Sequence, residues 1–188
     1  MSLTTAQQST LKAAILANAT WNAFPNTADG NYAIADLLNA YPAVDFLVWR
    51  TEASVQDIID AVDGSKYTPS DTADGTAIYT NRILACQTKQ MSLQTLIQGR
   101  ESINSSKSNI RSWLRDAVIQ VPAGAAGVFI APGGSSGATA LAACLRKARE
   151  IEKILTTGPA TTGSTTANLL GYEGTVTYTD VQSARNSA

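Results

Sequence analysis

The residues with the greatest catalytic potential lie in one short motif, and the chain lacks the side chain that would activate them. Gly133-Gly134-Ser135-Ser136-Gly137 fits the Gly-x-Ser-x-Gly pattern, which places a nucleophilic serine between a strand and a helix. A predicted strand at 128–131 and a predicted helix after Gly137 supply that context. The serine also needs a base, but the 188-residue chain has no histidine and no suitably placed Ser-x-x-Lys. The motif therefore favours a loop that feeds a helix N-terminus over a catalytic site.

Phosphate-binding and metal-binding chemistry are also disfavoured. Ala138 follows Gly137 where a Walker A loop requires lysine, and no dinucleotide-binding glycine pattern is present. Cys86 and Cys144 form no Cys-x-x-Cys pair, which is the usual arrangement in zinc and redox sites. Asp57, Asp60 and Asp63 have helical spacing, whereas calcium sites gather oxygen ligands in a loop. We therefore expect no catalytic residue, no cofactor and no metal, and hence no enzyme.

Charge is sparse and unevenly distributed. Charged residues make up 15% of the chain, against roughly 25% in ordinary globular proteins, which indicates a surface extensively covered by partners. Residues 1–75 hold nine acids and three bases, whereas residues 76–188 hold six acids and eleven bases. This asymmetry permits head-to-tail packing of copies or a basic face against an acidic partner. Internal pairing between the two halves explains it equally well.

Hydrophobic spacing and capping residues predict a mainly α fold. We expect a bundle of four to six helices, a small C-terminal β element and an extended loop and tail. The predicted helices span about 4–18, 33–40, 54–62, 76–98, 106–120 and 137–157. Thr4 and Gln7 have the spacing of a capping box for the first of them. Ser54 would cap the third, with Val55, Ile58, Ile59 and Val62 facing inward. The domain prediction is a helical body over residues 1–157, with an apolar Gly/Ala-rich loop at 122–137. Residues 158–188 would then form a linker, a short β segment and a tail.

The helix expected at 137–157 has the most regular pattern in the chain. Leu141, Leu145, Ala148, Glu152 and Leu155 would face inward, with basic residues on the outer face. Gly158 would end this helix, and the Thr/Gly/Ser-rich stretch 161–166 would form a link. Strands are expected within 169–178, and Thr179 with Gln182 would cap a short final helix.

Residues at the chain start lack the basic and apolar regions of a signal peptide. The longest uncharged, largely apolar run, 121–132, is far shorter than the ~20 residues that cross a bilayer. These features predict a soluble protein made in a cytoplasm, with no membrane partner.

Several short segments, taken in their order along the chain, resemble a known family. They are Val48-Trp49-Arg50-Thr51, the run from Ile103 to Arg111, the run from Leu145 to Lys153, Thr157-Gly158, the run from Gly171 to Val176, and Asp180-Val181. This series is similar to the head–tail connector proteins, also called adaptor or neck proteins, of tailed bacteriophages. The resemblance spans most of the chain from the first helix onward.

The resemblance implies a structural virion protein without catalytic residues. It would be synthesised in the host cytoplasm and form a homo-oligomeric ring in the neck, matched to the portal at about twelve copies. Its partners would be the portal protein and a tail or nozzle protein, with possible non-specific contact to packaged DNA. The candidate interface residues are Trp49, Arg50, Lys107, Arg111, Phe129, Arg146, Arg149, Lys153, Tyr172 and Glu173.

Four alternatives remain open at this level. Two are other virion roles, capsid decoration and tail termination. A third is a small regulatory binding module, and the fourth is a lysine-assisted hydrolase that uses Ser135 or Ser136.

Overall fold

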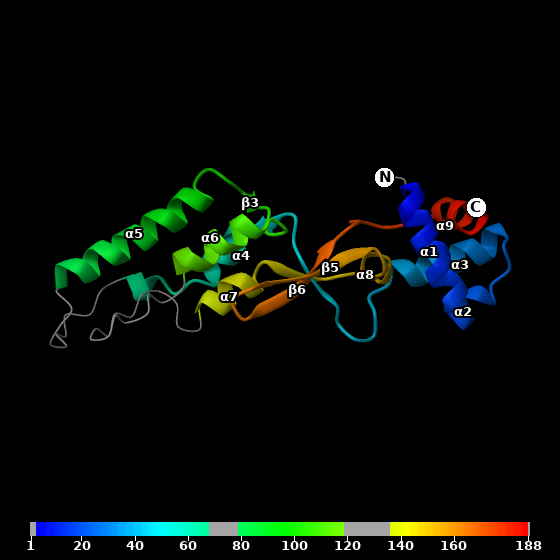
Figure 1. Cartoon of the computed structure of the whole chain (residues 1–188), viewed down its shortest axis with the longest axis horizontal. Coiled ribbons are helices and arrows are strands. Elements are labelled where there is room, and N and C mark those ends of the chain that lie inside the picture. Colours follow the sequence, from blue (N-terminus) through cyan, green and yellow to red (C-terminus); the bar gives the residue numbers. More distant parts are fainter. Residues whose placement is uncertain (1–2, 68–78, 119–135, 188) are drawn as a thin grey trace. The chain divides into compact units, whose positions relative to one another are not determined.

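The computed structural model describes residues 3–67, 79–118 and 136–187 (Figure 1). Within these residues, hydroxyl side chains cap the start of several helices. The Thr4 side chain accepts from the Gln7 backbone N–H, and the Gln7 side chain accepts from Thr4 N. Ser54 caps the helix that follows it in the same way, by accepting from Asp57 N. Such caps satisfy backbone N–H groups that have no partner within the helix.

Contacts divide the chain into two compact units that interleave along the sequence. The first unit comprises Met1–Val48, Lys147–Pro159 and Asn168–Ala188, and the second comprises Trp49–Arg146 and Ala160–Ala167. The chain therefore passes between the units four times, and neither unit is one continuous stretch.

The first unit is built around α1 (Thr5–Ala17), α3 (Ala28–Asn39) and α9 (Tyr178–Asn186), with α2 (Ala19–Asn22) and α8 (Glu150–Ile154) beside them. α9 packs against both α1 and α3, as Figure 1 shows. Its interior is almost entirely apolar, with Leu11, Ile15, Ile34, Leu38, Ile151 and Val181 at its centre.

Within its described residues, the second unit contains four helices, a 3-10 turn and a short sheet. These are α4 (Val55–Asp60), η1 (Gly64–Tyr67), α5 (Tyr79–Ile97), α6 (Ser108–Val118) and α7 (Ser136–Ala142). β2 (Ala53–Ser54) pairs antiparallel with β3 (Ser102–Ile103). α6 packs against both α5 and α7, so Leu114 and Ala117 are fully buried.

A four-stranded sheet has the order β4-β1-β6-β5, and the division between the units passes through its strands. The strands are β1 (Leu47–Trp49), β4 (Leu145–Lys147), β5 (Thr156–Thr162) and β6 (Thr165–Leu170). β1 runs parallel to β6, with Val48 opposite Asn168. On its other side, β1 lies antiparallel to β4, because Arg50 N donates to Cys144 O and Ala148 N donates to Phe46 O.

This mixed sheet shows that the predicted mainly α bundle with a small C-terminal β element was wrong. The largest error is the helix expected at 137–157. α7 ends at Ala142, β4 follows, and α8 holds only Glu150–Ile154. Long-range pairing of β4 with β1 overrides the local helical spacing, which a single sequence cannot reveal.

Two further expectations at the C-terminal end were also wrong. The stretch 161–166 is not a link, because it contains the end of β5, a turn at Gly163 (φ 60°) and the start of β6. Thr161 and Thr166 lie opposite each other there, with their hydroxyl oxygens 2.9 Å apart. The last helix begins two residues earlier than expected, with Thr177 in place of Thr179 as its cap and Asp180 as the reciprocal partner.

Other helices were predicted correctly in existence and approximate extent. α1, α4, α5 and α6 fall within the expected ranges. α3 begins at Ala28, before the predicted start, because Thr27 caps it and Gly30 lies inside the helix. A Cβ at Gly30 would stand 2.1 Å from the Pro25 carbonyl oxygen, so glycine permits a close approach of the two segments here.

Candidate interface surfaces

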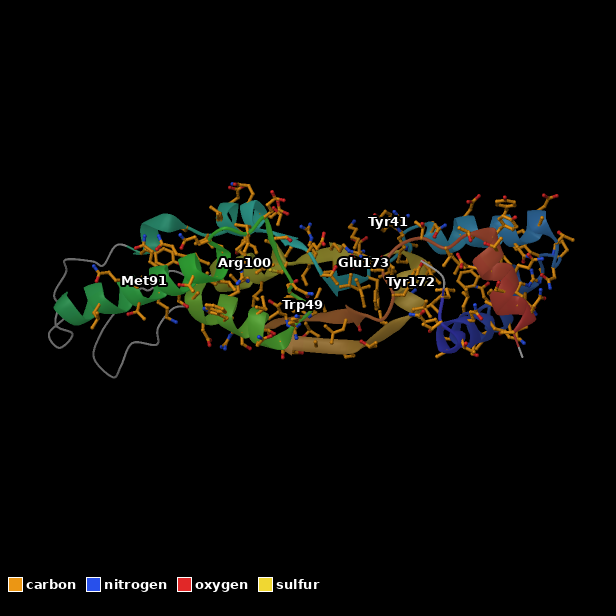
Figure 2. All side chains as sticks on the ribbon, turned by 90° about the horizontal axis from the view of Figure 1, so that it is seen from above. Tyr41, Trp49, Met91, Arg100, Tyr172 and Glu173 are labelled. Atoms are coloured by element: carbon orange, nitrogen blue, oxygen red, sulfur yellow. The ribbon has the colours of Figure 1, made fainter. Side chains whose placement is uncertain are left out.

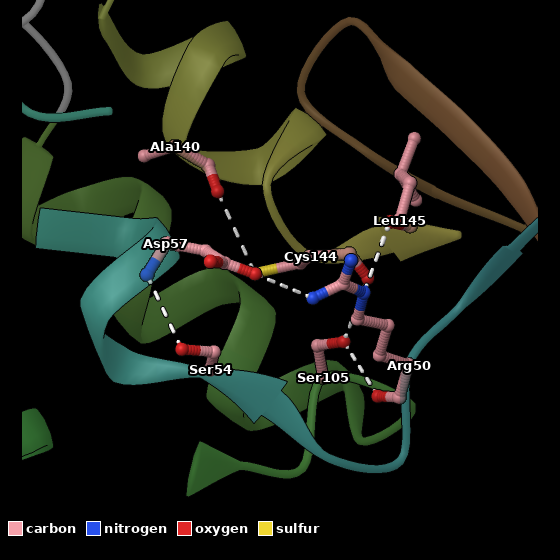
Figure 3. A network of polar contacts seen from close by, with 7 residues as sticks. All are labelled: Arg50, Ser54, Asp57, Ser105, Ala140, Cys144 and Leu145. Carbon is pink, nitrogen blue, oxygen red and sulfur yellow. Dashed lines mark hydrogen bonds and ion pairs between the residues drawn. The ribbon is translucent and has the colours of Figure 1, made fainter. Parts of the chain in front are cut away.

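Arg50 holds together three segments of the second unit, rather than projecting freely from it (Figure 3). Its guanidinium donates to Leu145 O (3.1 Å) and to Asp57 Oδ2 (2.7 Å). The Ser105 hydroxyl lies within hydrogen-bond distance of two carbonyl oxygens, Arg50 O at 2.6 Å and Cys144 O at 3.2 Å. This network joins the chain after β1, α4, the loop after β3 and the start of β4.

Trp49 and Arg111 form the buried centre of the second unit. The Arg111 guanidinium lies 4.8 Å from the Trp49 ring centroid and donates to Thr162 Oγ1 and to the carbonyls of Ser105 and Ser106. Trp49 Nε1 donates to Ala160 O at 2.9 Å. Exposure is 0% for Trp49 and 3% for Arg111, so both side chains serve the interior of their unit.

Cys144 is a buried thiol that ionises less readily than a free cysteine. Its Sγ donates to Ala140 O, and burial raises its pKa from 9.0 to about 11. Burial also raises the pKa of the Cys86 thiol. Only the thiolate is a good nucleophile, so neither cysteine is activated. Within the described residues, no group of three metal-ligating side chains comes together.

In the first unit, Tyr172 and Arg149 are also committed to internal contacts. Tyr172 is 6% exposed, and its hydroxyl donates to Thr175 O at 2.6 Å. Arg149 donates to Asn39 O at 3.0 Å, and its guanidinium lies 5.7 Å from the Tyr41 ring centroid. The buried Glu152 accepts from Arg149 N and Gly174 N, which fixes the loop after β6 to the start of α8.

The remaining candidate residues do not share one helix face. Lys107 and Glu173 are exposed, and Lys153 pairs with Glu150 at 3.1 Å. Arg146 lies on β4 and is half-buried. Phe129 lies outside the described residues. The basic surface expected along a helix at 137–157 is therefore divided between a strand and the short α8.

The sequence analysis missed a run of exposed apolar side chains that extends from the last turn of α3 to the start of β1, and we call it the Leu37–Leu47 segment. Four large apolar side chains are exposed there: Leu37 (42%), Tyr41 (60%), Val44 (83%) and Leu47 (42%). Tyr41 is marked in Figure 2. The available signal was a run of apolar residues around Pro42, in a loop where polar residues are usual.

A second exposed surface lies on α5, where Leu84 and Met91 are 62% and 65% exposed. They are seven residues apart and so lie on the same helical face. Lys89 is the one charged residue between positions 84 and 98, and its ammonium group donates to Asp116 O. This face is therefore uncharged over about four turns.

The chain matches no family model, no curated protein and no solved structure. Among the described helices, none is both long enough and apolar enough to span a membrane.

Proposed function

We propose that this protein is a structural component of a tailed-phage virion, a head–tail adaptor that forms a homo-oligomeric ring between the portal and the tail or nozzle. The proposal combines the family resemblance with one structural observation. That observation is the group of four exposed apolar side chains in the Leu37–Leu47 segment.

Exposed apolar side chains gathered in one segment favour a surface that a partner covers. Single exposed apolar residues are ordinary on soluble proteins, but four within eleven consecutive positions favour an interaction site. Val44 is 83% exposed, so its burial in an interface would remove almost its entire side chain from water. A side chain of this kind contributes about 1.5–3 kcal/mol when it passes from full exposure to full burial.

Charge supports an apolar ring contact over an acid–base one. Lys147 pairs with Asp45 at 2.9 Å, and Arg50 pairs with Asp57 at 2.7 Å, each inside its own unit. The first unit holds seven acids and five bases, and the second holds eight acids and nine bases. The strong asymmetry along the sequence is thus nearly balanced within each unit, and we base the ring contact on the Leu37–Leu47 segment.

The test begins with the purified virus particle. Peptide mass spectrometry, normalised to the major capsid protein, should find about twelve copies of the chain for one portal-matched ring. Hundreds of copies would instead establish a decoration protein, and absence from particles would overturn the proposal.

A matched pair of variants then tests the surface. Val44→Asp should prevent incorporation into particles while the isolated protein keeps its wild-type circular dichroism spectrum and unfolding midpoint. Ser183→Asp, an equally simple change at an exposed position on α9, should be incorporated normally. Normal incorporation of Val44→Asp would exclude the Leu37–Leu47 segment as the ring contact.

A further inference from the structure

The first unit contains a small pocket that the adaptor role does not use. It has a volume of about 200 Å³ and is lined by Lys12, Ile15, Leu16, Asn22, Asn26 and Arg185. These residues come from α1, α2, the loop before α3, and α9. At about 30 Å³ per water, the pocket has room for several waters or for one small polyatomic ion.

The lining carries two positive charges and no carboxylate. Lys12 Nζ donates to Ser187 O, and Arg185 donates to Phe24 O, Pro25 O and Asn31 Oδ1. All of these acceptors are neutral carbonyl or amide oxygens. Among the described residues, neither cation forms an ion pair with an acid.

Both cations keep donors for a ligand. An ammonium group has three N–H donors and a guanidinium has five, so each retains N–H groups beyond those that hold the chain. Asn22 adds a side-chain amide from the end of α2, and Asn26 donates to Asn186 Oδ1 at the same wall. Ile15 and Leu16 supply an apolar side of the pocket.

We propose that this pocket binds a small oxyanion, a phosphate or a carboxylate group. Two cations in a lining that holds no carboxylate, together with amide donors, form the donor set that such a group requires. The Arg185 guanidinium is held by three acceptors, so it is fixed in place before the ligand arrives. The inference rests on the first unit alone and does not depend on ring assembly.

The experiment is a titration of the ¹⁵N-labelled full chain, followed by amide signals in two-dimensional NMR. Sodium phosphate is one probe and sodium acetate the other, with ionic strength held constant by sodium chloride. We expect saturable shifts confined to the Asn22 and Asn26 side-chain amides and the signals of α9, with a Kd on the order of 1 mM. Saturation by phosphate alone identifies a phosphate ligand, and saturation by acetate identifies a carboxylate ligand such as an acidic side chain.

Two variants make the result decisive. Lys12→Gln should weaken binding about tenfold, because it removes a charged donor. Leu16→Glu places a carboxylate at the rim, at a residue 58% exposed, and should abolish binding without disturbing the fold. Lys107→Gln, an exposed lysine of the second unit, is the control and should bind like wild type. Shifts that never saturate, or that persist unchanged in both pocket variants, would overturn the proposal.

Discussion

The interiors of the two units are held together by different interactions. The first unit buries a continuous apolar cluster drawn from α1, α3, α8 and α9. At the centre of the second unit, buried polar groups bond to partners far along the chain. The Trp49 N–H donates to Ala160 O, the Ser105 hydroxyl lies within hydrogen-bond distance of Cys144 O, and the Arg111 guanidinium donates to Thr162 Oγ1. Apolar spacing is a local property of sequence, whereas such pairs depend on which distant segments meet. The comparison predicts different mutational responses in the two units.

The largest effect should follow from removing the buried cation of the second unit. Arg111→Leu deletes the contact with the Trp49 ring and leaves the carbonyls of Ser105 and Ser106 without their donor. We expect a loss of about 4 kcal/mol in the free energy of unfolding, measured by urea denaturation. Arg115→Leu, on the same helix but 39% exposed at its side chain, should change it by less than about 0.5 kcal/mol. If Arg111→Leu lowers the free energy of unfolding as little as Arg115→Leu is expected to, the buried hydrogen bonds of Arg111 do not stabilise the unit.

The apolar interior of the first unit should respond to loss of volume instead. Leu38 is fully buried and its neighbour Leu37 is 42% exposed, so the two positions form a matched pair. Leu38→Ala should cost about 3 kcal/mol, and Leu37→Ala no more than about 0.5 kcal/mol. The same denaturation experiment decides this, and a small cost at Leu38 would contradict the assignment of the core.

Alkaline pH should destabilise the second unit through Cys144. Its pKa is about 11 in the folded chain against an ordinary 9.0, because burial disfavours the thiolate. The unfolded thiol ionises first, so stability is complete below about pH 9 and falls by about 2 kcal/mol as pH rises toward 11. Cys144→Ala should remove this slope. The difference between the two stability curves from pH 8 to 10.5 isolates Cys144 from other groups that titrate there, and parallel curves would exclude the effect.

The smallest effect is expected at Glu152, a buried carboxylate that fixes a loop of the first unit. Glu152 accepts with both oxygens, from Arg149 N and Gly174 N. Glu152→Gln keeps one acceptor oxygen, so one of the two bonds is lost at a cost of about 1 kcal/mol. Glu150→Gln, which breaks only the partly buried pair with Lys153, should cost less than about 0.5 kcal/mol. A reversed order would mean that the loop is fixed by other contacts.

Local sequence signals predicted the features that local chemistry controls. The reciprocal cap of Thr4 and Gln7 was predicted from residue types three positions apart, and the structure confirms it. The cap at Ser54 and the inward positions of Val55 and Ile58 are likewise confirmed, whereas Ile59, also expected to face inward, is 43% exposed. Each of these features depends on residues within one or two helical turns.

The errors occur where a distant strand decides the outcome. Leu141, Leu145 and Ala148 have helical spacing, yet the backbone around Leu145 is extended because β1 offers it hydrogen bonds. A signal of this break was present, since Glu152 stands three residues after Arg149 and caps a helix that restarts at Glu150. The threonine pairs on either side of Gly163-Ser164 were a comparable hairpin signal, because threonine favours strands and glycine favours the turn.

The candidate site was less predictable than the fold. Trp49, Arg111 and Tyr172 were selected through the family resemblance, and their side chains lie in the interior of the units. Exposure depends on which residues the tertiary structure covers, so the Leu37–Leu47 segment and the pocket at Lys12 and Arg185 could not be identified from local spacing.

The interleaving of the two units limits how the chain can be cut into fragments. The first unit includes both Met1 and Ala188, so any continuous fragment that contains all of it also contains the whole second unit. A fragment of residues 49–146 lacks Ala160–Ala167, and with them the Thr162 hydroxyl that receives Arg111. A protease that cleaves one crossing leaves three others intact, so the two units stay covalently joined after a single nick. Truncation of the gene therefore separates these units less readily than it separates domains that follow one another along the sequence.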